Sequence, residues 1–579
     1  MSGGQDISIC YLFRMSVSTI IGFNCGVHDA SVSLLQNNEV KAVYTEERFS
    51  CFKQRGDTIT QPLTQLLKDF DIDLNNVDMF ATTTSLVINE TNDIYEHHRE
   101  RVKFYPHHLC HAIGALLFSK FEDDTMVLTL DAGDFNIQAL QFGDRLMDGD
   151  VDKTVKFHAK PWHDRYQNNC YCVFGSVSVY RNGTLRTIKE FNLNFGNLYL
   201  MGCHTMYAHG IRGTNIEGKL MGLSSQGKYN HDLYTLYRSL CRFDAATESF
   251  ESLSQCAQPG FANGWLHHKI VNLGLQHDVR DCAYNLQKAL QDGVSELVQF
   301  YKNKLNTRRI CLSGGVFANV KLNQLINENF GFDEIFVMPA MSDEGISLGA
   351  ALTAYYTPNG MTDAYTVRPI KVPDHVYLGK GYTDEEIESF VKSQCKQYHP
   401  FDHSVLTKEL QSGKIVGVFR GRSEYGPRAL GNRSILVDPS NRDTFSVLNH
   451  RLQRNEIMPF APAILAERVE EILHCTHSKR SAQFMTTCYN VRSEWINKIP
   501  AVINVHDNTC RPQIVTSTSN IWLHTVLNNY NDATGIPVLL NTSFNTHGYP
   551  IINEPSQAYD ALRNNVVDIV VIGDYIVYA

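Results

Sequence analysis

The sequence lacks the features that mark membrane proteins, secreted proteins and disulfide-bonded proteins. Its 579 residues include no apolar run of about eighteen residues, the shortest that crosses a membrane as a helix. The chain does not begin with a basic stretch, an apolar run and a cleavage site, as a signal peptide does. No two of its 15 cysteines are spaced as a CxxC pair. We therefore expect a cytoplasmic protein whose cysteines are reduced core residues.

An excess of positive charge is also absent. The formal net charge of −9 at pH 7 and the pI near 6.2 argue against a broad basic surface, so no nucleic-acid partner is expected. A local basic pocket for phosphate remains compatible with these values. Hydrophobic residues make up 43% of the chain, which is enough for two or three domains with cores of their own. We expect at least one domain boundary.

Alternation of apolar and polar residues predicts β-hairpins in the first part of the chain. Thr19–Asn24 is predicted to be the first strand, and Ala30–Leu35 is its hairpin partner. A clearer hairpin joins Val177–Tyr180 to Leu185–Ile188, because the intervening Asn182-Gly183 pair favours a two-residue turn.

In the middle of the chain, short apolar strands run into glycine-containing loops and then helices. Arg309–Leu312 leads through Ser313-Gly314-Gly315 to a predicted helix at Val320–Glu328. Glu334–Met338 leads through Ser342–Gly345 to another helix. Such units place phosphate or metal ligands at the carboxyl ends of strands. Hairpins followed by these units indicate an α/β nucleotide-binding domain built on two halves.

A stretch rich in proline and glycine, Tyr355–Asp374, is the expected linker between two domains. After it, a helix at Asp384–Val391 and a strand at Lys414–Phe419 open a second α/β module. The predicted boundaries are 1–18 for an N-terminal extension, 19–360 for the first domain, 361–375 for the linker and 376–579 for the second domain.

His107 and His111 are the first candidates for a chemical role. If their segment is helical, both imidazoles lie on one face one turn apart and can share a first-row metal, although surface histidines at this spacing are common. Asp131 ends an apolar strand, and Asp343 lies in the loop before a helix. The two aspartates fit a mixed nitrogen and oxygen site for iron, manganese or zinc, but each also fits a helix cap or turn.

Glycines and a His-Asp pair mark further candidate sites. Glu217–Leu223 and Ser313–Val316 allow backbone amides to approach a phosphate or adenosine, and ordinary turns explain such glycines as well. His28 and Asp29 follow the first strand, where a general base or a substrate-orienting pair fits, and so does an Asx turn.

The segment from Gly421 to Ser434 combines three arginines with glycines and small polar residues. Such a composition suits a rigid anion-binding loop better than a core or a regular helix, because guanidinium groups bind phosphate through two hydrogen bonds. Further donors to the same ligand are expected nearby in the second module. The candidate residues of this module are Arg422, Arg428, Arg433, Arg511, Asn541, Ser543 and Asn545.

Taken in order, these motifs resemble the NodU/CmcH-type O-carbamoyltransferases, which include the tobramycin and other natural-product carbamoyltransferases. The resemblance runs from about Ile20 to the C-terminus. The motifs that carry it are His28-Asp29-Ala30-Ser31, Glu46-Glu47-Arg48-Phe49, the His107/His111 segment, Glu424–Ser434, Pro459-Phe460-Ala461-Pro462 and Asn541–Asn545.

The resemblance implies two cooperating α/β domains. The first would be similar to the actin/sugar-kinase-like (ASKHA) domain of the tRNA threonylcarbamoyl transferases, and the second to the YrdC fold. The second domain would make carbamoyl adenylate from carbamoyl phosphate and Mg-ATP. The first would pass the carbamoyl group to a hydroxyl of a small molecule or natural product, releasing AMP.

The resemblance also assigns roles to the candidate residues. Iron(II), or another divalent first-row metal, would be bound by His107, His111, Asp131 and Asp343. Our own hypothesis, apart from the resemblance, is that His28, with Asp29 beside it, takes the proton of the acceptor hydroxyl. The remaining candidates for binding the adenylate in the first domain are Lys219, Gly222, Gly314, Gly315 and Asn319.

The sequence departs from the family at Gln453 and Asn455, where the family usually has a lysine and an arginine. Each lost charged hydrogen bond would weaken triphosphate binding by about 1–3 kcal/mol, unless Arg451 or Arg454 compensates. A kinase acting on a small alcohol and a degenerate nucleotide-binding regulatory protein therefore stay open as alternatives. The stretch Asp144–Asn169 either lines the acceptor pocket or is a packed surface excursion, and the oligomeric state, including a homodimer, is open.

Overall fold

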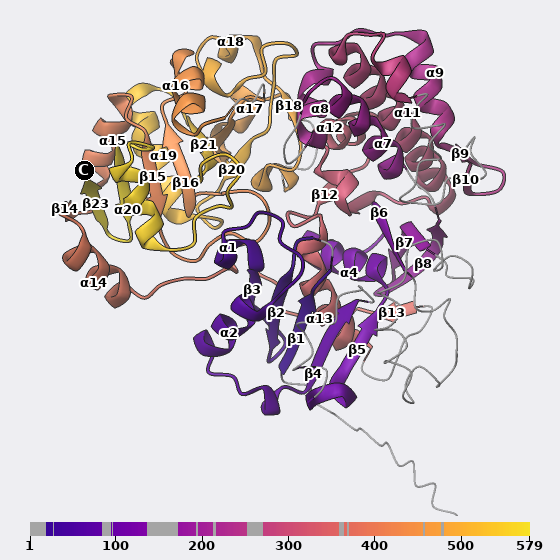
Figure 1. Cartoon of the computed structure of the whole chain (residues 1–579), viewed down its shortest axis with the longest axis horizontal. Helices are drawn as coiled ribbons and strands as arrows, with labels where there is room; N and C mark the ends of the chain where they lie inside the picture. Colours follow the sequence, from indigo (N-terminus) through magenta and orange to yellow (C-terminus); the bar gives the residue numbers. More distant parts are fainter. Residues whose placement is uncertain are drawn as a thin grey trace, which may run out of the picture.

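The computed structural model describes residues 19–26, 28–83, 94, 97–135, 172–192, 195–211, 216–251, 270–357, 364–367, 370–454, 458–475 and 480–579. It has an N-terminal part, residues 19–357, and a C-terminal part, residues 376–579 (Figure 1). The α/β class and the two-part architecture expected from the sequence are confirmed. Among the described residues, no helix is both long enough and apolar enough to cross a membrane.

The first sheet of the N-terminal part has the strand order β3-β2-β1-β4-β5. The first three strands form antiparallel hairpins, and β4 and β5 then run parallel to β1. The predicted first strand agrees residue for residue with β1. The bounds are β1 (Thr19–Asn24), β2 (Ser31–Gln36), β3 (Glu39–Thr45), β4 (Met79–Thr83) and β5 (Val102–Tyr105), with α1 (Glu46–Ser50) and α2 (Thr60–Asp69) after β3.

The second sheet repeats this arrangement. From β8 its order is β8-β7-β6-β11-β12, again with two antiparallel hairpins followed by two parallel strands. The turn at Asn182-Gly183 has positive φ at both residues, as the sequence predicts. The prediction of a domain built on two halves is confirmed. The bounds are β6 (Thr125–Phe135), β7 (Cys172–Arg181), β8 (Thr184–Phe191), β11 (Arg309–Ser313) and β12 (Glu334–Val337).

Two buried helices, α4 (His107–Ser119) and α13 (Ile346–Tyr356), pack against each other between these sheets (Figure 1). Both are apolar on nearly every face, as expected of helices without a solvent side. They approach closely because Gly349 has no side chain: a Cβ there would lie 2.3 Å from the carbonyl oxygen of Cys110. The N-terminus of α4 is thereby held against the ends of strands from the second sheet.

Helices cover the outer face of the second sheet, and the 27-residue α11 packs against α7, α8, α9 and α12. Part of the predicted linker is ordered as β13, which pairs with β8, so it extends the second sheet. The bounds are α7 (Phe195–Ala208), α8 (Ile216–Ser224), α9 (His231–Leu240), β9 (Arg242–Asp244), β10 (Ser249–Glu251), α11 (Val279–Leu305), α12 (Val320–Asn329) and β13 (Ala364–Thr366).

The C-terminal part is built on an eight-stranded sheet of order β14-β23-β22-β15-β16-β21-β17-β20. Alternate residues of its strands enter two different cores, one on each face; Ile569 and Val571 enter one, and Val570 and Ile572 the other. The strands are β14 (Gln397–Pro400), β15 (Val416–Phe419), β16 (Arg433–Val437), β17 (Ala461–Leu465), β20 (Gln513–Val515), β21 (Val538–Ser543), β22 (Ile569–Ile572) and β23 (Tyr575–Tyr578).

Helices cover both faces of this sheet. Residues of α15 and α19 enter one core, and residues of α14 and α20 enter the other. A short ribbon of β18 and β19 lies outside the main sheet. The bounds are α14 (Asp384–Gln394), α15 (His403–Gln411), α16 (Asp443–Arg451), α17 (Val469–Ile472), β18 (Tyr489–Asn490), α18 (Ser493–Ile496), β19 (Thr509–Cys510), α19 (Ile521–Thr534) and α20 (Pro555–Arg563).

The two parts share one hydrophobic core. The core of the N-terminal part includes seven buried residues from the C-terminal part, and polar contacts reinforce the junction. Arg48 of α1 donates to the carbonyl oxygen of Gly426 at 3.0 Å, and Lys321 of α12 binds Asp507 at 2.5 Å. The seven shared residues are Val376, Leu378, Tyr425, Leu430, Ala461, Phe484 and Met485.

Candidate functional site

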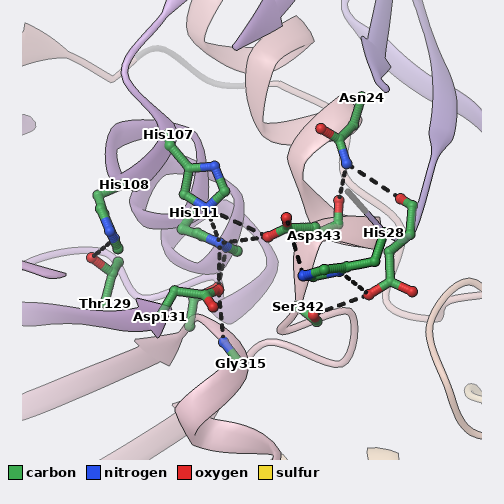
Figure 2. Close-up of polar contacts among 12 residues, drawn as sticks. Asn24, His28, His107, His108, His111, Thr129, Asp131, Gly315, Ser342 and Asp343 are labelled. Carbon is green, nitrogen blue, oxygen red and sulfur yellow. Dashed lines mark hydrogen bonds and ion pairs between the residues drawn. The ribbon is translucent and has the colours of Figure 1, made fainter. Parts of the chain in front are cut away.

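The four predicted metal ligands lie together in the N-terminal part (Figure 2). His107 and His111 come from the first turns of α4, Asp131 from β6 and Asp343 from the turn after β12. Each offers one ligand atom, and these four atoms all lie within 4.8 Å of one another. The structure therefore joins residues that are up to 236 positions apart in the chain, from 107 to 343.

The histidines are presented by the start of a buried helix. Pro106 is the N-cap of α4, and the helix begins with His107 itself. His107 and His111 lie one turn apart, with their Nε2 atoms 3.1 Å from each other. The Nδ1 atom of His111 is 3.1 Å from the hydroxyl of Ser313, which fixes the ring so that Nε2 points to the centre.

A glycine turn brings a backbone amide to Asp131. The amide of Gly315 donates to Oδ2 of Asp131 at 2.8 Å. The preceding Gly314 has φ +96°, and a Cβ at that position would lie 2.1 Å from the carbonyl oxygen of Leu130. Only glycine allows this loop to approach the end of β6 so closely.

Asp343 is not the cap of the helix that follows it. The N-cap positions are Ser342 for the short 3₁₀ turn and Gly345 for α13, and neither has a side-chain cap. Oδ1 of Asp343 is buried and accepts no hydrogen bond from the described residues. It lies 3.4 Å from Nε2 of His107 and 3.8 Å from Nε2 of His111. The capping alternative is therefore wrong, and the carboxylate is directed at the histidines.

The spacing of these donors fits a shared ion. Two ligand atoms each about 2.1 Å from one metal lie about 3.0 Å apart at a right angle and about 3.4 Å apart in a tetrahedron. The contacts of His111 with His107 and Asp131 are 3.1 and 3.3 Å, and that of His107 with Asp343 is 3.4 Å. Two imidazoles with two carboxylates suit iron(II), manganese or zinc.

The pKa values of the two carboxyl groups shift in opposite directions, because only Asp131 is lowered by strong hydrogen bonds. Burial alone would raise the pKa of Asp131, but hydrogen bonds from His111 and from the Gly315 amide hold that pKa below its usual range. Burial raises the pKa of Asp343, against the opposing charge of His107. Two carboxyl groups are thus enclosed with little solvent to stabilise their charge, an arrangement that a bound cation would relieve.

His28 and Asp29 lie beside this centre. His28 Nδ1 is 3.0 Å from Oδ2 of Asp29, and its Nε2 is 3.9 Å from Oδ2 of Asp343 (Figure 2). The hydroxyl of Ser342 donates to the same Asp29 oxygen at 3.1 Å. The hydrogen bond with Asp29, opposed by burial and aided by the charge of Asp343, raises the pKa of His28 to about 10. The pair is therefore an ordered, charged dyad next to the predicted metal ligands.

The predicted adenylate residues of the N-terminal part have different surroundings. Gly314 and Gly315 form the turn at Asp131, so they belong to the centre. Asn319 caps α12 and exchanges two hydrogen bonds with the amide of Gln287, at 2.8 and 3.0 Å. Lys219 and Gly222 lie within helix α8 rather than in a glycine loop.

Helix α8 corrects the expectation that its glycine offers a free amide. The backbone amides of a helix interior are already hydrogen-bonded within the helix. A Cβ at Gly222 would lie 2.6 Å from the sulfur of Met458, so this glycine permits close packing against the C-terminal part.

Glu424 organises the arginine-containing loop of the C-terminal part. Its side chain is only 3% exposed, and Oε1 accepts the backbone amides of Leu430, Asn432 and Arg433 at 2.7, 2.8 and 3.2 Å. Three amides directed at one buried carboxylate oxygen fix the loop without any regular secondary structure.

Two of the three arginines in this loop bind protein backbone. The Arg422 guanidinium donates to the carbonyl oxygens of Gly379, Leu378 and Lys41, and thereby bridges the two parts. Arg433 is fully buried, donates to the carbonyls of Arg420 and Gly421, and lies over the ring of Phe419. Their donors are mostly occupied, so we assign both a role in loop structure. Arg428 and Arg511 are partly exposed and remain the candidates for binding phosphate.

Asn541 is joined to the same loop through Gln513. Asn541 donates to Oε1 of Gln513 at 2.6 Å, and Gln513 donates to the carbonyl of Leu430 at 2.7 Å. Ser543 lies at the end of β21 opposite Ser434. Asn545 donates to the carbonyls of Thr546 and Tyr549. Buried hydrogen bonds thus connect the loop with β20 and β21.

Two family models match the sequence. The model for the carbamoyltransferase N-terminus covers residues 65–352, and the model for the carbamoyltransferase C-terminus covers residues 407–579. The chain belongs to the carbamoyltransferase family.

Curated relatives of this carbamoyltransferase include rhizobial nodulation proteins. Nodulation protein NolO of Bradyrhizobium diazoefficiens is 29% identical over 81% of this chain and 78% of its own length. Nodulation protein NolNO of Sinorhizobium fredii is 26% identical over 96% of this chain and 79% of its own length. Among solved structures, full-length HypF in a phosphate- and nucleotide-bound form matches with a TM-score of 0.34 and 12% identity, over 59% of this chain and 56% of its own.

Of the two residues at which this carbamoyltransferase departs from the family pattern, the structure describes Gln453. Gln453 has a positive φ of 55° at the end of a turn, and Asn455 lies outside the described residues. Arg451 binds Asp568 at 2.7 Å, so it is engaged within the C-terminal part. Arg454 lies over the ring of Phe460. Both proposed substitutes are therefore engaged with neighbouring side chains of the C-terminal part.

The proposed acceptor segment, Asp144–Asn169 with Trp162, His163, Arg165 and Tyr166, also lies outside the described residues.

Sequence reasoning missed three residues that order the carbamoyltransferase's sites. Ser313 orients His111, Ser342 binds Asp29, and Glu424 fixes the arginine loop. Ser313 and Ser342 lie directly before predicted turns, and this position could have identified them as hydrogen-bonding residues of the site. Nothing in the sequence alone shows that Glu424 points inward.

Proposed function

We propose that the enzyme is an ATP-dependent O-carbamoyltransferase that uses carbamoyl phosphate. Its C-terminal part would form carbamoyl adenylate, and its N-terminal part would transfer the carbamoyl group to a hydroxyl of a small molecule or natural product. The observation that carries the proposal is the convergence of His107, His111, Asp131 and Asp343 beside the His28–Asp29 dyad. Such a convergence would put a cation site beside a candidate proton acceptor, the combination that acyl transfer to an alcohol requires.

The four ligands fit iron(II) or another divalent first-row metal, and we propose iron(II) because the family resemblance implies it. A bound ion of this kind would supply Lewis-acid polarisation of an oxygen at the centre. Its second role would be electrostatic, because a cation relieves the enclosed negative charge of Asp131 and Asp343.

In the transfer step, the acceptor oxygen attacks the carbamoyl carbon, the bond to the adenylate oxygen breaks, and AMP leaves. The hydroxyl proton passes to His28. With Asp343 uncompensated, His28 already holds a proton, because Asp29 and Asp343 raise its pKa to about 10. To act as the base, His28 would first release this proton to solvent, to which its side chain is partly exposed, while the hydrogen bond to Asp29 continues to orient the ring.

In the C-terminal part, Arg428 and Arg511 would bind the phosphates of ATP and carbamoyl phosphate. The backbone-bound Arg422 and Arg433 would hold the loop that carries Arg428. The buried carboxylate of Glu424 would keep the same loop rigid.

The function is tested by incubating the enzyme with Mg-ATP, labelled carbamoyl phosphate and Fe(II) without acceptor. Carbamoyl adenylate and pyrophosphate are the expected products, and both should require carbamoyl phosphate. ADP formed from ATP and an alcohol without carbamoyl phosphate would instead identify a kinase. Binding of ATP with no turnover would support the regulatory alternative.

Replacing His28 with alanine is expected to slow transfer by roughly 10²–10⁴-fold, the usual contribution of a general base. The measurement is AMP release from carbamoyl adenylate in the presence of a panel of polyol acceptors. Adenylate formation in the C-terminal part should be unchanged, which controls for folding. The exposed His231 of α9, replaced in the same way, is the matched control. Full transfer activity in the His28→Ala enzyme would exclude the proposed role.

A further inference from the structure

His108, the residue between the first predicted ligand and the rest of α4, is fully engaged by the second sheet. It is 2% exposed, and its Nδ1 lies 2.9 Å from the hydroxyl of Thr129 on β6. Its Nε2 lies 3.2 Å from the carbonyl oxygen of Val173 on β7 (the Thr129 contact is drawn in Figure 2). Both ring nitrogens are therefore used, so His108 is not a metal ligand despite its place beside His107.

The partners of His108 define its tautomer. The Val173 carbonyl can only accept, so Nε2 carries the hydrogen and Nδ1 accepts from the Thr129 hydroxyl. The Thr129 oxygen then accepts the backbone amide of Ser176 at 3.1 Å and the Ser176 hydroxyl at 2.8 Å. The side-chain polar atoms of His108, Thr129 and Ser176 thus all have partners. A buried hydrogen-bond network rigidifies a core when its members are satisfied in this way.

This hydrogen-bond network lies on the same helix and strand that carry three of the predicted metal ligands. Thr129 and Asp131 are two residues apart on β6 and point to the same face of the sheet. His108 and His111 meet that face from the first turn of α4: His108 contacts Thr129, and His111 Nε2 is 3.3 Å from Asp131. Two neighbouring contacts, one from His108 and one from His111, thus join α4 to β6.

We propose that His108 is a positioning residue that fixes the start of α4 on strands β6 and β7 and so holds the two histidine ligands in place. The claim that His108 positions metal ligands rests on the metal centre of the proposed function. The claim that His108 fixes the start of α4 on β6 and β7 does not. The ring of His108 packs edge-on against that of His107, with centroids 5.3 Å apart, so a shift of His108 displaces the ligand directly.

Three substitutions separate hydrogen bonding from volume. His108→Phe keeps an aromatic ring and removes both hydrogen bonds. His108→Gln keeps one donor and one acceptor. Thr129→Val keeps the shape of the strand residue and removes the hydroxyl. The matched control is Thr353→Val, because Thr353 is equally buried and its hydroxyl reaches α4 at the sulfur of Cys110, 3.9 Å away, while its main bond is to its own helix.

The first measurement is the affinity for Co(II), titrated against a chromophoric chelator, together with the ligand-field spectrum of the bound ion. His108→Phe and Thr129→Val are expected to weaken binding by about 10–100-fold and to alter the spectrum, the usual effect of losing an outer-shell partner. His108→Gln should bind more tightly than His108→Phe, and Thr353→Val should match the unaltered enzyme.

The second measurement needs no metal. Hydrogen–deuterium exchange of the peptide that spans α4 should accelerate in His108→Phe and Thr129→Val but not in Thr353→Val. If the unaltered enzyme and His107→Ala bind Co(II) equally weakly, the proposed metal centre fails, and the exchange result alone decides the positioning role. Unchanged exchange in folded Thr129→Val and His108→Phe enzymes would overturn the inference, as would an equal loss of affinity in Thr353→Val.

Discussion

Replacing His111 with alanine is expected to abolish stoichiometric metal binding and to reduce carbamoyl transfer by roughly 10³-fold or more. His111 is the central member of the four candidate ligands, because its Nε2 lies between 3.1 and 3.8 Å from a donor atom of each of the other three. Its loss would leave two buried carboxyl groups with a single imidazole. Adenylate formation is expected to continue, because the C-terminal loop does not contact His111.

Metal content of the purified protein and AMP release from carbamoyl adenylate measure the two effects, and pyrophosphate release measures the first half-reaction. His231→Ala is again the control, because His231 is exposed and distant in sequence from the centre. A His111→Ala enzyme that retains a full equivalent of iron would show that the four residues do not bind the metal together.

Replacing Glu424 with alanine is expected to destabilise the C-terminal part by about 3–5 kcal/mol and to eliminate adenylate formation. Three backbone amides would lose their acceptor inside the protein, where water does not replace it. The loop that carries Arg428 would then lose its fixed conformation. Glu424→Gln keeps an oxygen acceptor, so a smaller loss of stability is expected.

Scanning calorimetry and pyrophosphate release test this expectation. Glu388→Ala, in α14, removes a carboxylate that binds the exposed Lys392 and the hydroxyl of Tyr575, and it should leave both quantities nearly unchanged. Normal adenylate formation by the Glu424→Ala enzyme would show that this loop does not form the adenylation site.

Much of the fold follows from the sequence because local signals agree with tertiary packing. The strand Thr19–Asn24 and the Asn182-Gly183 turn were predictable from alternation and from turn chemistry. The linker was less predictable, since Ala364–Thr366 adds a strand to β8. A three-residue edge strand has too short a pattern to be distinguished from a proline-containing connection.

The candidate centre was partly predictable for a different reason. The 107/111 spacing and the strand-end position of Asp131 are local, but the approach of Asp343 depends on the pairing of β11 with β6 and β12. The arginine loop shows the limit. Sequence patterns identify its cations, yet Arg422 and Arg433 donate to backbone carbonyls, and a guanidinium suits a carbonyl and a phosphate equally well.

The core shared by the two parts has a consequence for biosynthesis. Tyr425, Leu430 and Met485 complete a core most of whose other residues are translated earlier, in the segment that ends with α13. During translation the N-terminal part therefore exposes an apolar face until these later residues are made, on the order of ten seconds at ordinary elongation rates. A nascent chain in that state is a natural client for a ribosome-bound chaperone, and a gene truncated after the linker would make a permanently unfinished product.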